Sequence, residues 1–184
     1  MMIEVFILAL LLAKIKKYPL RPFFKSWASY PILFSLGFYI VLEIMIFRGN
    51  FQWISYSQVI HTGILLVYII PALRFELYKP ALVGTGSMMA GMFLNQTAIY
   101  FNHGKMPIFP SLSYITGYVN PQMASQISKL HTLGNANTRL IFLTDILDLG
   151  YTILSAGDVL IRMFPFLMIY YSIKKLAESG GMNS

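Results

Sequence analysis

The stretch Trp27–Phe47, WASYPILFSLGFYIVLEIMIF, decides the fold class of this chain. Its residues are almost all apolar, and Glu43 carries its only charge. A membrane helix needs about 20 mostly apolar residues to cross about 30 Å of hydrocarbon. The stretch is therefore long and apolar enough to predict a membrane-spanning helix.

The composition of the whole chain agrees with that prediction. Of its 184 residues, 57% are apolar and 11% are charged, whereas soluble domains contain about 25% charged residues. A chain so poor in charge cannot cover its surface against water, which excludes an ordinary soluble globular enzyme and a disordered tail. The absence of cysteine excludes disulfides, thiolate metal sites and cysteine nucleophiles.

Four further apolar stretches predict an all-α, polytopic membrane helix bundle that forms a single domain over residues 1–184. About five transmembrane helices are expected, at residues 1–15, 27–47, 56–73, 81–101 and 151–173. The first stretch reaches only about 22 Å as a helix. It has an acidic residue before the apolar run and lysines after it, the reverse of a signal peptide, so we expect a retained helix.

The distribution of lysine and arginine predicts the orientation of this bundle. With five spans, nine basic residues fall on one side and four on the other. The nine are Lys14, Lys16, Lys17, Arg21, Lys25, Arg74, Lys79, Lys174 and Lys175, and the four are Arg48, Lys105, Lys129 and Arg139. Basic loops stay in the cytoplasm, so the N-terminus is predicted outside and the C-terminus inside. Because topology accounts for most of the net charge of +7, no nucleic-acid partner is expected.

The predicted outer loop, residues 103–150, is too polar in its middle to cross a membrane. Leu140–Leu149 is apolar apart from Thr144, Asp145 and Asp148. It is too short to span, which predicts a re-entrant or interfacial segment before the last helix. The tail, residues 178–184, contains glycine and serine and is expected to be mobile.

Polar side chains at membrane depth cost about 2.5–3.5 kcal/mol each, so their positions are informative. With the predicted topology they gather in the outer leaflet, next to Lys105 and Asp148 of the outer loop. The side chains within the spans are Glu43, His61, Asn95, Asn102, Asp158 and Arg162. This distribution predicts a one-sided site that binds a ligand, a membrane lipid or a membrane-protein partner. A transporter module is a third alternative. The inner-leaflet halves of the predicted spans contain few polar side chains, however, and offer a substrate no path to the cytoplasm.

One helix face combines small and polar residues at spacings of three and four: Gly84, Ser87, Gly91, Asn95, Ala98 and Asn102. Small residues allow helices to approach closely in membranes, so this stripe predicts a packing face. The two asparagines are larger than packing requires and are expected to find polar partners.

Two pairs of charged residues leave alternatives open. Asp158 and Arg162 are four residues apart, which fits an intrahelical ion pair or a charged group facing a wetted cavity. Asp145 and Asp148 would share a face at helical spacing, and fit either acid–base chemistry or a capped turn. His103 and His131 are expected to be solvated. No histidine spacing favours a metal site, and no cofactor is predicted.

Several motifs of the second half resemble an uncharacterised family of small bacterial multi-pass membrane proteins, domain of unknown function 5317. They are Leu94-Asn95-x-x-Ala98, Asn102-His103-Gly104-Lys105-Met106-Pro107, Thr138-Arg139-Leu140, Leu143-Thr144-Asp145 and Ser155-Ala156-Gly157-Asp158. The family usually has glycine where His103 and Thr144 stand. The resemblance implies the plasma membrane of a bacterium and supplies no activity.

A second resemblance, to lipoprotein signal peptidase, concerns four motifs in the same order. They are Asn102-His103-Gly104, Gly134-Asn135-Ala136-Asn137-Thr138-Arg139, Leu143-Thr144-Asp145-Ile146 and Ser155-Ala156-Gly157-Asp158. That family consists of membrane aspartic proteases, so the likeness implies that Asp145 and Asp158 share a proton and activate water. Asn137 stands where that family has aspartate. An intramembrane hydrolase is therefore the alternative to a binding or accessory protein.

Overall fold

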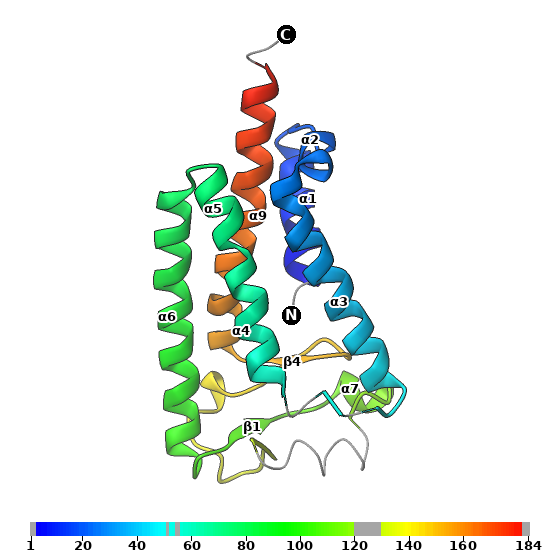
Figure 1. Cartoon of the computed structure of the whole chain (residues 1–184). Coiled ribbons are helices and arrows are strands. Elements are labelled where there is room, and N and C mark those ends of the chain that lie inside the picture. The colour runs from blue at the N-terminus through cyan, green and yellow to red at the C-terminus, as the bar shows by residue number, and fades with distance from the viewer. Residues whose placement is uncertain (1–2, 51, 54–55, 120–129, 182–184) are drawn as a thin grey trace. The chain divides into compact units, whose positions relative to one another are not determined.

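The computed structural model describes residues 3–50, 52–53, 56–119 and 130–181 and is mostly helical (Figure 1). The chain divides into two compact units, and three of the four divisions fall within helices. Unit 1 comprises residues 1–43, 55–86 and 162–184, and unit 2 comprises residues 44–54 and 87–161. Lys129 and residues 182–184, which enter the sequence predictions, lie outside the described residues.

Unit 1 is built from helices. They are α1 (Ile3–Ile15), α2 (Arg21–Lys25), the 3₁₀ helix η1 (Trp27–Ser29), most of α3 (Tyr30–Phe47), α4 (Ser57–Val67), α5 (Ile69–Arg74), the start of α6 (Tyr78–Phe101) and most of α9 (Ala156–Gly181). The end of α1 is a Schellman motif, in which Lys17 has a φ of 60° and the Tyr18 N–H donates to the Ala13 carbonyl at 2.9 Å. The chain therefore turns after Ile15, and Lys16 and Lys17 lie in the turn that leads to α2.

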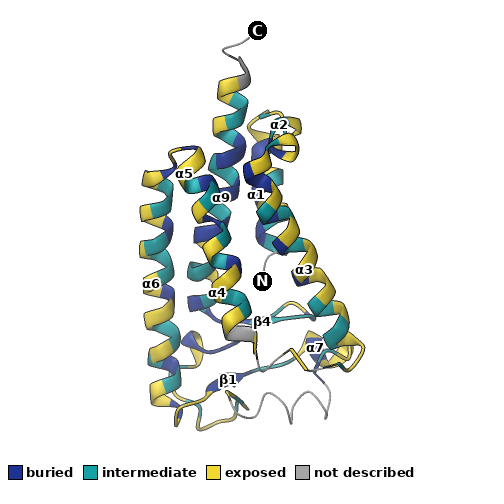
Figure 2. Ribbon diagram, viewed as in Figure 1, coloured by how far each residue is buried: buried dark blue, intermediate teal, exposed yellow. Residues whose placement is uncertain are grey.

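The interior of unit 1 is mostly apolar, and α1 and α9 contribute many of its buried side chains (Figure 2). Tyr68 is fully buried and makes an edge-to-face contact with Phe164, with ring centroids 5.9 Å apart. A Cβ atom at Gly84 would lie 2.9 Å from the Cα atom of Phe164. Glycine at this position of the small-residue stripe therefore allows α6 to approach α9 closely.

Unit 2 combines helix ends with short strands. It contains the end of α3, α6 from Ser87 onward, β1 (Met106–Ile108), α7 (Leu112–Ile115), β2 (His131–Leu133), the 3₁₀ helix η3 (Ile141–Leu143), β3 (Leu147–Asp148), β4 (Ile153–Leu154) and the first turns of α9. β1 pairs in parallel with β2, and Ile108 also forms an isolated parallel bridge with Asp145. β3 pairs with β4 in antiparallel fashion.

Close packing between α6 and α9 continues in unit 2. A Cβ atom on Gly91 would lie 2.3 Å from the carbonyl oxygen of Gly157. About one helical turn away on each helix, the Ser87 hydroxyl donates to the Leu160 carbonyl at 2.9 Å. The packing prediction for the small-residue stripe is confirmed at these positions.

Two of the described helices are long and apolar enough to cross a membrane. Trp27–Phe47 has a mean hydropathy of 1.9, and Ala156–Ser179 has 1.3. The sequence predicts about five spans, but the other helices do not meet the same criteria. α1 is too short, Val59–Arg74 is a shorter apolar segment, and the polar residues of α6 lower its hydropathy.

Three sequence predictions need correction. The last helix begins at Ala156 rather than Tyr151, because Ile153 and Leu154 form β4. Leu140–Leu149 contains η3 and β3 rather than a continuous helix, so Asp145 and Asp148 do not share a helical face. α9 continues to Gly181, so the first residues of the tail that we expected to be mobile are helical.

Candidate functional site

Asp158 belongs to the N-terminal cap of α9. The Asp158 N–H donates to the Ser155 hydroxyl at 2.9 Å, and the Ser155 N–H donates back to Oδ2 of Asp158 at 3.2 Å. This reciprocal pair is a capping box with aspartate in the third helical position. It places the carboxyl at the positive end of the helix dipole, which favours a negative charge there.

Asn95 of α6 connects this cap to the small-residue stripe. Its Nδ2 donates to Oδ1 of Asp158 at 2.9 Å, and its Oδ1 accepts from the Ser155 hydroxyl at 2.7 Å. A carboxylate only accepts hydrogen bonds, so the orientation of the amide follows from its partners. A Cβ atom on Gly157 would lie 2.0 Å from Oδ1 of Asn95, so glycine makes room for this ring of hydrogen bonds.

Asp145 is buried beside β1 and only 4% of its surface is exposed. Its N–H donates to the Pro107 carbonyl at 3.1 Å and its carbonyl accepts from the Phe109 N–H at 2.9 Å, which fixes its backbone. Oδ2 lies 3.7 Å from Nε2 of His131, a residue of the neighbouring strand β2. That distance is too long for a hydrogen bond.

The side chains of Asp145 and His131 are incompletely paired. Among the described residues, Oδ1 of Asp145 and Nδ1 of His131 are buried without a hydrogen-bond partner. Burial and, second, the charge of Asp158 raise the pKa of Asp145 to about 8. Burial lowers the pKa of His131, against an opposing effect of Asp158. Near neutral pH both groups are therefore uncharged, and they do not form a salt bridge.

Asp148 has the opposite environment. Its Oδ2 accepts from the N–H groups of Ser111 and Ser113 at 2.6 and 2.9 Å, and its Oδ1 accepts from the Ser113 hydroxyl and the Gly150 N–H. Partial burial raises the pKa of Asp148, but these hydrogen bonds outweigh that effect and lower it to about 2. Of the two interpretations left open by the sequence, the geometry is that of a capped turn at the start of α7.

Two other predicted binding residues lie near the end of α6. The Asn102 amide donates to the Arg139 carbonyl at 2.9 Å and accepts from the Arg139 N–H at 2.9 Å, so it fastens the loop before η3 to α6. Lys105 is exposed in the turn before β1. His103, in the same turn, has a φ of 59°, a conformation that suits the glycine usual in the resembled family.

The other predicted polar residues belong to unit 1. Nη1 of Arg162 forms an ion pair with Oε1 of Glu4 at 3.1 Å, and the Glu43 carboxylate accepts from the Tyr39 hydroxyl. Glu43 also lies within electrostatic reach of Glu4 and Arg162. His61 lies on α4, half-buried.

The structure thus divides the predicted site. Asn95, Asp145 and Asp158 come together in unit 2, whereas Glu43 and Arg162 belong to a charged cluster of unit 1. The alternative of an intrahelical pair between Asp158 and Arg162 is not observed, because each of them pairs with another residue.

Three residues have roles that the sequence analysis missed. His131 is half-buried against Asp145 rather than solvated, Glu4 pairs with Arg162, and Ser155 caps α9. Only the cap had a readable signal, because serine followed three residues later by an acid and then an apolar run is typical of a helix start. Among the described residues no group of three histidine or acidic side chains is arranged to hold a metal ion.

Comparison with known proteins identifies the family of this chain. The model of a family of unknown function (DUF5317) matches residues 21–170. The chain belongs to this family. The matched segment of this DUF5317 protein includes every residue of the Asp145, His131 and Asp158 group and leaves out Glu4. No curated protein and no solved structure matches the chain.

Proposed function

We propose that this protein is a multi-pass membrane protein with five membrane-embedded helical segments, an outer N-terminus and a cytoplasmic C-terminus. Its two candidate spans support this location. So do large apolar side chains on the helix surfaces, because Phe34 and Leu82 are each 77% exposed and Phe93 is 71% exposed. Surfaces of this kind are typical of contact with lipid rather than with water.

Cysteine labelling tests this topology, since the chain contains no cysteine of its own. Ala136 and Ser179 are exposed and lie on opposite sides in the proposed topology. In intact cells an impermeant thiol reagent should label the Ala136→Cys protein and spare the Ser179→Cys protein. Labelling of the Ser179→Cys protein alone would invert the topology, and equal labelling of both in intact cells would place both sites on the same side and reject the five-span topology.

We further propose that unit 2 is a one-sided binding module of the outer leaflet. The observation that carries this proposal is the buried Asp145 carboxyl, whose Oδ1 has no hydrogen-bond partner among the described residues. Buried polar atoms are normally paired, and perturbed pKa values cluster at functional sites. A buried carboxyl group with one unpaired oxygen and a raised pKa therefore supports a ligand-binding role for Asp145.

The charges at this site favour a cationic ligand that donates hydrogen bonds. Two carboxyl groups, Asp145 and Asp158, interact there, and His131 is the neighbouring base. Because burial lowers the pKa of His131, this base is neutral at pH 7 and does not balance the charge of Asp158. A primary ammonium group would supply the missing positive charge and N–H donors, and its arrival would release the proton of Asp145.

Amine probes test this proposal on the full chain in detergent. Ethanolamine, as a free amine, or phosphatidylethanolamine, as a lipid headgroup, should raise the melting temperature at pH 7, and the effective probe identifies the source of the ligand. Choline and phosphatidylcholine carry the same charge without N–H donors and should have little effect. The Asp145→Asn protein should respond to none of them. An equal response of this variant and the unaltered protein would reject the site.

An intramembrane aspartic hydrolase is the second candidate. It is favoured by the electrostatic interaction between Asp145 and Asp158, which is, after burial, the second cause of the raised pKa of Asp145. The capping bonds and the Asn95 amide, however, engage both carboxylate oxygens of Asp158. A hydrolase would cleave a reconstituted membrane-anchored peptide, and Asp145→Asn and Asp158→Asn would each abolish the cleavage.

A further inference from the structure

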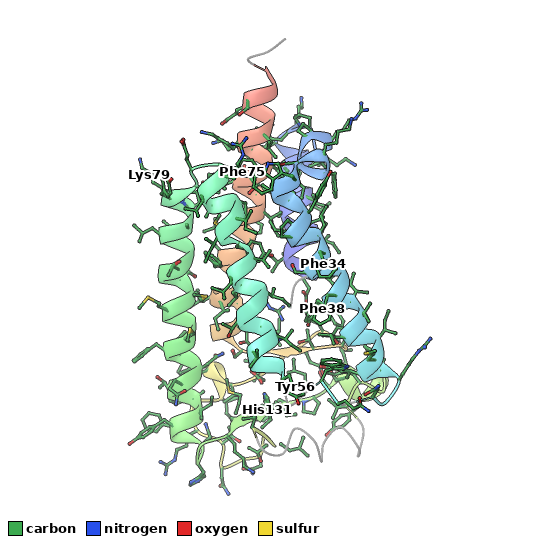
Figure 3. All side chains as sticks on the ribbon, viewed as in Figure 1. Phe34, Phe38, Tyr56, Phe75, Lys79 and His131 are labelled. Atoms are coloured by element: carbon green, nitrogen blue, oxygen red, sulfur yellow. The ribbon has the colours of Figure 1, made fainter. Side chains whose placement is uncertain are left out.

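An open apolar groove lies between α3 and α4 within unit 1. It has a volume of about 310 Å³ and is lined by side chains that include Phe34, Phe38, Ile60 and Ile64. Phe34 and Phe38 project from the side of α3 that faces α4 (Figure 3). The lining contains no charged residue. The groove is thus suited to a hydrocarbon chain rather than to a polar ligand.

The groove is located at the beginning of α3. Its α3 wall extends from Pro31 to Phe38, which corresponds to about 11 Å of helix. Trp27 and Tyr30, directly before this wall, are 59% and 54% exposed. Exposed tryptophan and tyrosine at the end of a span are typical of the membrane–water interface. The groove therefore opens in the leaflet next to this interface.

Basic residues are concentrated at the same end of α3. All five are exposed and none forms an ion pair with a described acidic residue: Lys14, Lys16, Lys17, Arg21 and Lys25. The sequence contains no acidic residue from 5 to 42. α2, which carries two of these charges, packs against η1 at the start of α3. Basic clusters beside a span attract anionic lipid headgroups.

We propose that unit 1 binds an anionic phospholipid, with one acyl chain in the α3–α4 groove and the phosphate headgroup at the basic turn between α1 and α3. The apolar lining accounts for the chain, and the uncompensated positive charge accounts for the headgroup. This inference rests on the proposed membrane location, and in the proposed topology the lipid belongs to the cytoplasmic leaflet.

Gly63 offers a variant that fills the groove. It lines the groove, and a Cβ atom there would meet no atom within 4 Å. Gly63→Leu should therefore occupy the acyl-chain position without displacing the backbone. Gly37 of α3 is the matched control, because its Cβ position is equally open but it does not line the groove. Both changes replace a helical glycine with the same residue, so their effects on helix propensity should be similar.

The experiment measures lipid binding by quenching of Trp27 fluorescence in the full chain with Trp53→Phe. The protein is reconstituted into phosphatidylcholine vesicles that contain brominated phosphatidylglycerol or, at the same fraction, brominated phosphatidylcholine. We expect about a fivefold preference for phosphatidylglycerol, the equivalent of one basic contact. Gly63→Leu should remove most of this preference and Gly37→Leu should retain it. Replacing Lys16, Lys17 and Arg21 with glutamine should remove the headgroup preference.

Three results would overturn the proposal. They are equal quenching by the two lipids, equal behaviour of Gly63→Leu and Gly37→Leu, and loss of a co-purifying protein from Gly63→Leu without any change in lipid preference. The last result would assign the groove to a partner helix. Failure of the proposed membrane location is distinguishable, because the protein would then not co-float with vesicles of either composition.

Discussion

Asp145 and Asp148 are separated by two residues in unit 2, yet their surroundings are opposite. Asp148 accepts hydrogen bonds from the turn at Ser111 and Ser113, and its pKa is lowered to about 2. Asp145 is more deeply buried, has an oxygen without a partner among the described residues, and has a pKa raised to about 8. The same residue type is thus a charged cap at Asp148 and a neutral acid at Asp145.

The difference arises from the backbone around each residue. Asp148 is in β3, next to a turn whose N–H groups point at its carboxylate and satisfy its charge. Asp145 forms an isolated bridge with β1, so its own backbone groups are paired while its side chain faces His131 and the charge of Asp158. The number of hydrogen-bond donors that face each carboxyl, together with its burial, therefore decides which acid is ionised.

The largest effect is expected from Asp145→Asn. The native pKa of about 8 exceeds the ordinary value of 3.8, so the native state holds its proton more tightly than the unfolded state does. This group's contribution to stability is greatest below about pH 4 and is lost as the pH rises toward 8. Asparagine does not ionise, so the variant should be more stable by about 5 kcal/mol at pH 8.5 and of similar stability at pH 4.

Unfolding in mild detergent at both pH values measures this difference. A functional carboxyl should combine higher stability at pH 8.5 with loss of the amine response, because functional sites often trade stability for activity. Destabilisation of the Asp145→Asn protein at every pH would instead show that the carboxyl makes a structural hydrogen bond, and the contrast with Asp148 would disappear.

Asp148→Asn should have a smaller effect of opposite sign. Loss of the charged cap should cost about 1–2 kcal/mol at pH 7. The pKa of Asp148 is lowered, so its contribution is present above about pH 4 and is lost as the pH falls toward 2. The variant and the unaltered protein should therefore approach equal stability near pH 2. Ser113→Ala, which removes one donor, should be intermediate at pH 7, and an unchanged melting temperature for both variants would contradict the cap.

Much of the helical framework is predictable from apolar length and composition. Trp27–Phe47 is apolar throughout, and η1 and α3 occupy this stretch. The small-residue stripe indicates close helix packing because few other contacts suit Gly84 and Gly91. The start of α9 was misplaced because Tyr151–Leu154 is as apolar as the helix that follows it, although the Ser155 and Asp158 pattern marks the true beginning.

The candidate site was less predictable because its members come together through strand pairing. Asp145 and Asp158 are recognisable as unusual acids in an apolar chain, and their mutual influence is consistent with that expectation. His131 is brought beside Asp145 because β1 pairs with β2 on one side and with Asp145 on the other. Pairing of three-residue strands has no periodicity that a sequence reveals. The partner of Arg162 was also hidden, since Glu4 is 158 residues away.

The smallest effect is expected from Asp158→Asn. This variant distinguishes burial from the charge of Asp158 as the cause of the raised pKa of Asp145. Burial is the larger cause and the charge of Asp158 the second, so the variant should lower the pKa of Asp145 by about one unit. The amide oxygen of the new asparagine can still accept from Nδ2 of Asn95, and Ser155 remains the N-cap residue, so the fold should persist. The pH dependence of the infrared band of the protonated carboxyl measures the shift. A fall of about three units would identify a pair that shares a proton and favour the hydrolase. No change at all would remove Asp158 from the site and leave Asp145 as an acid held neutral by burial alone.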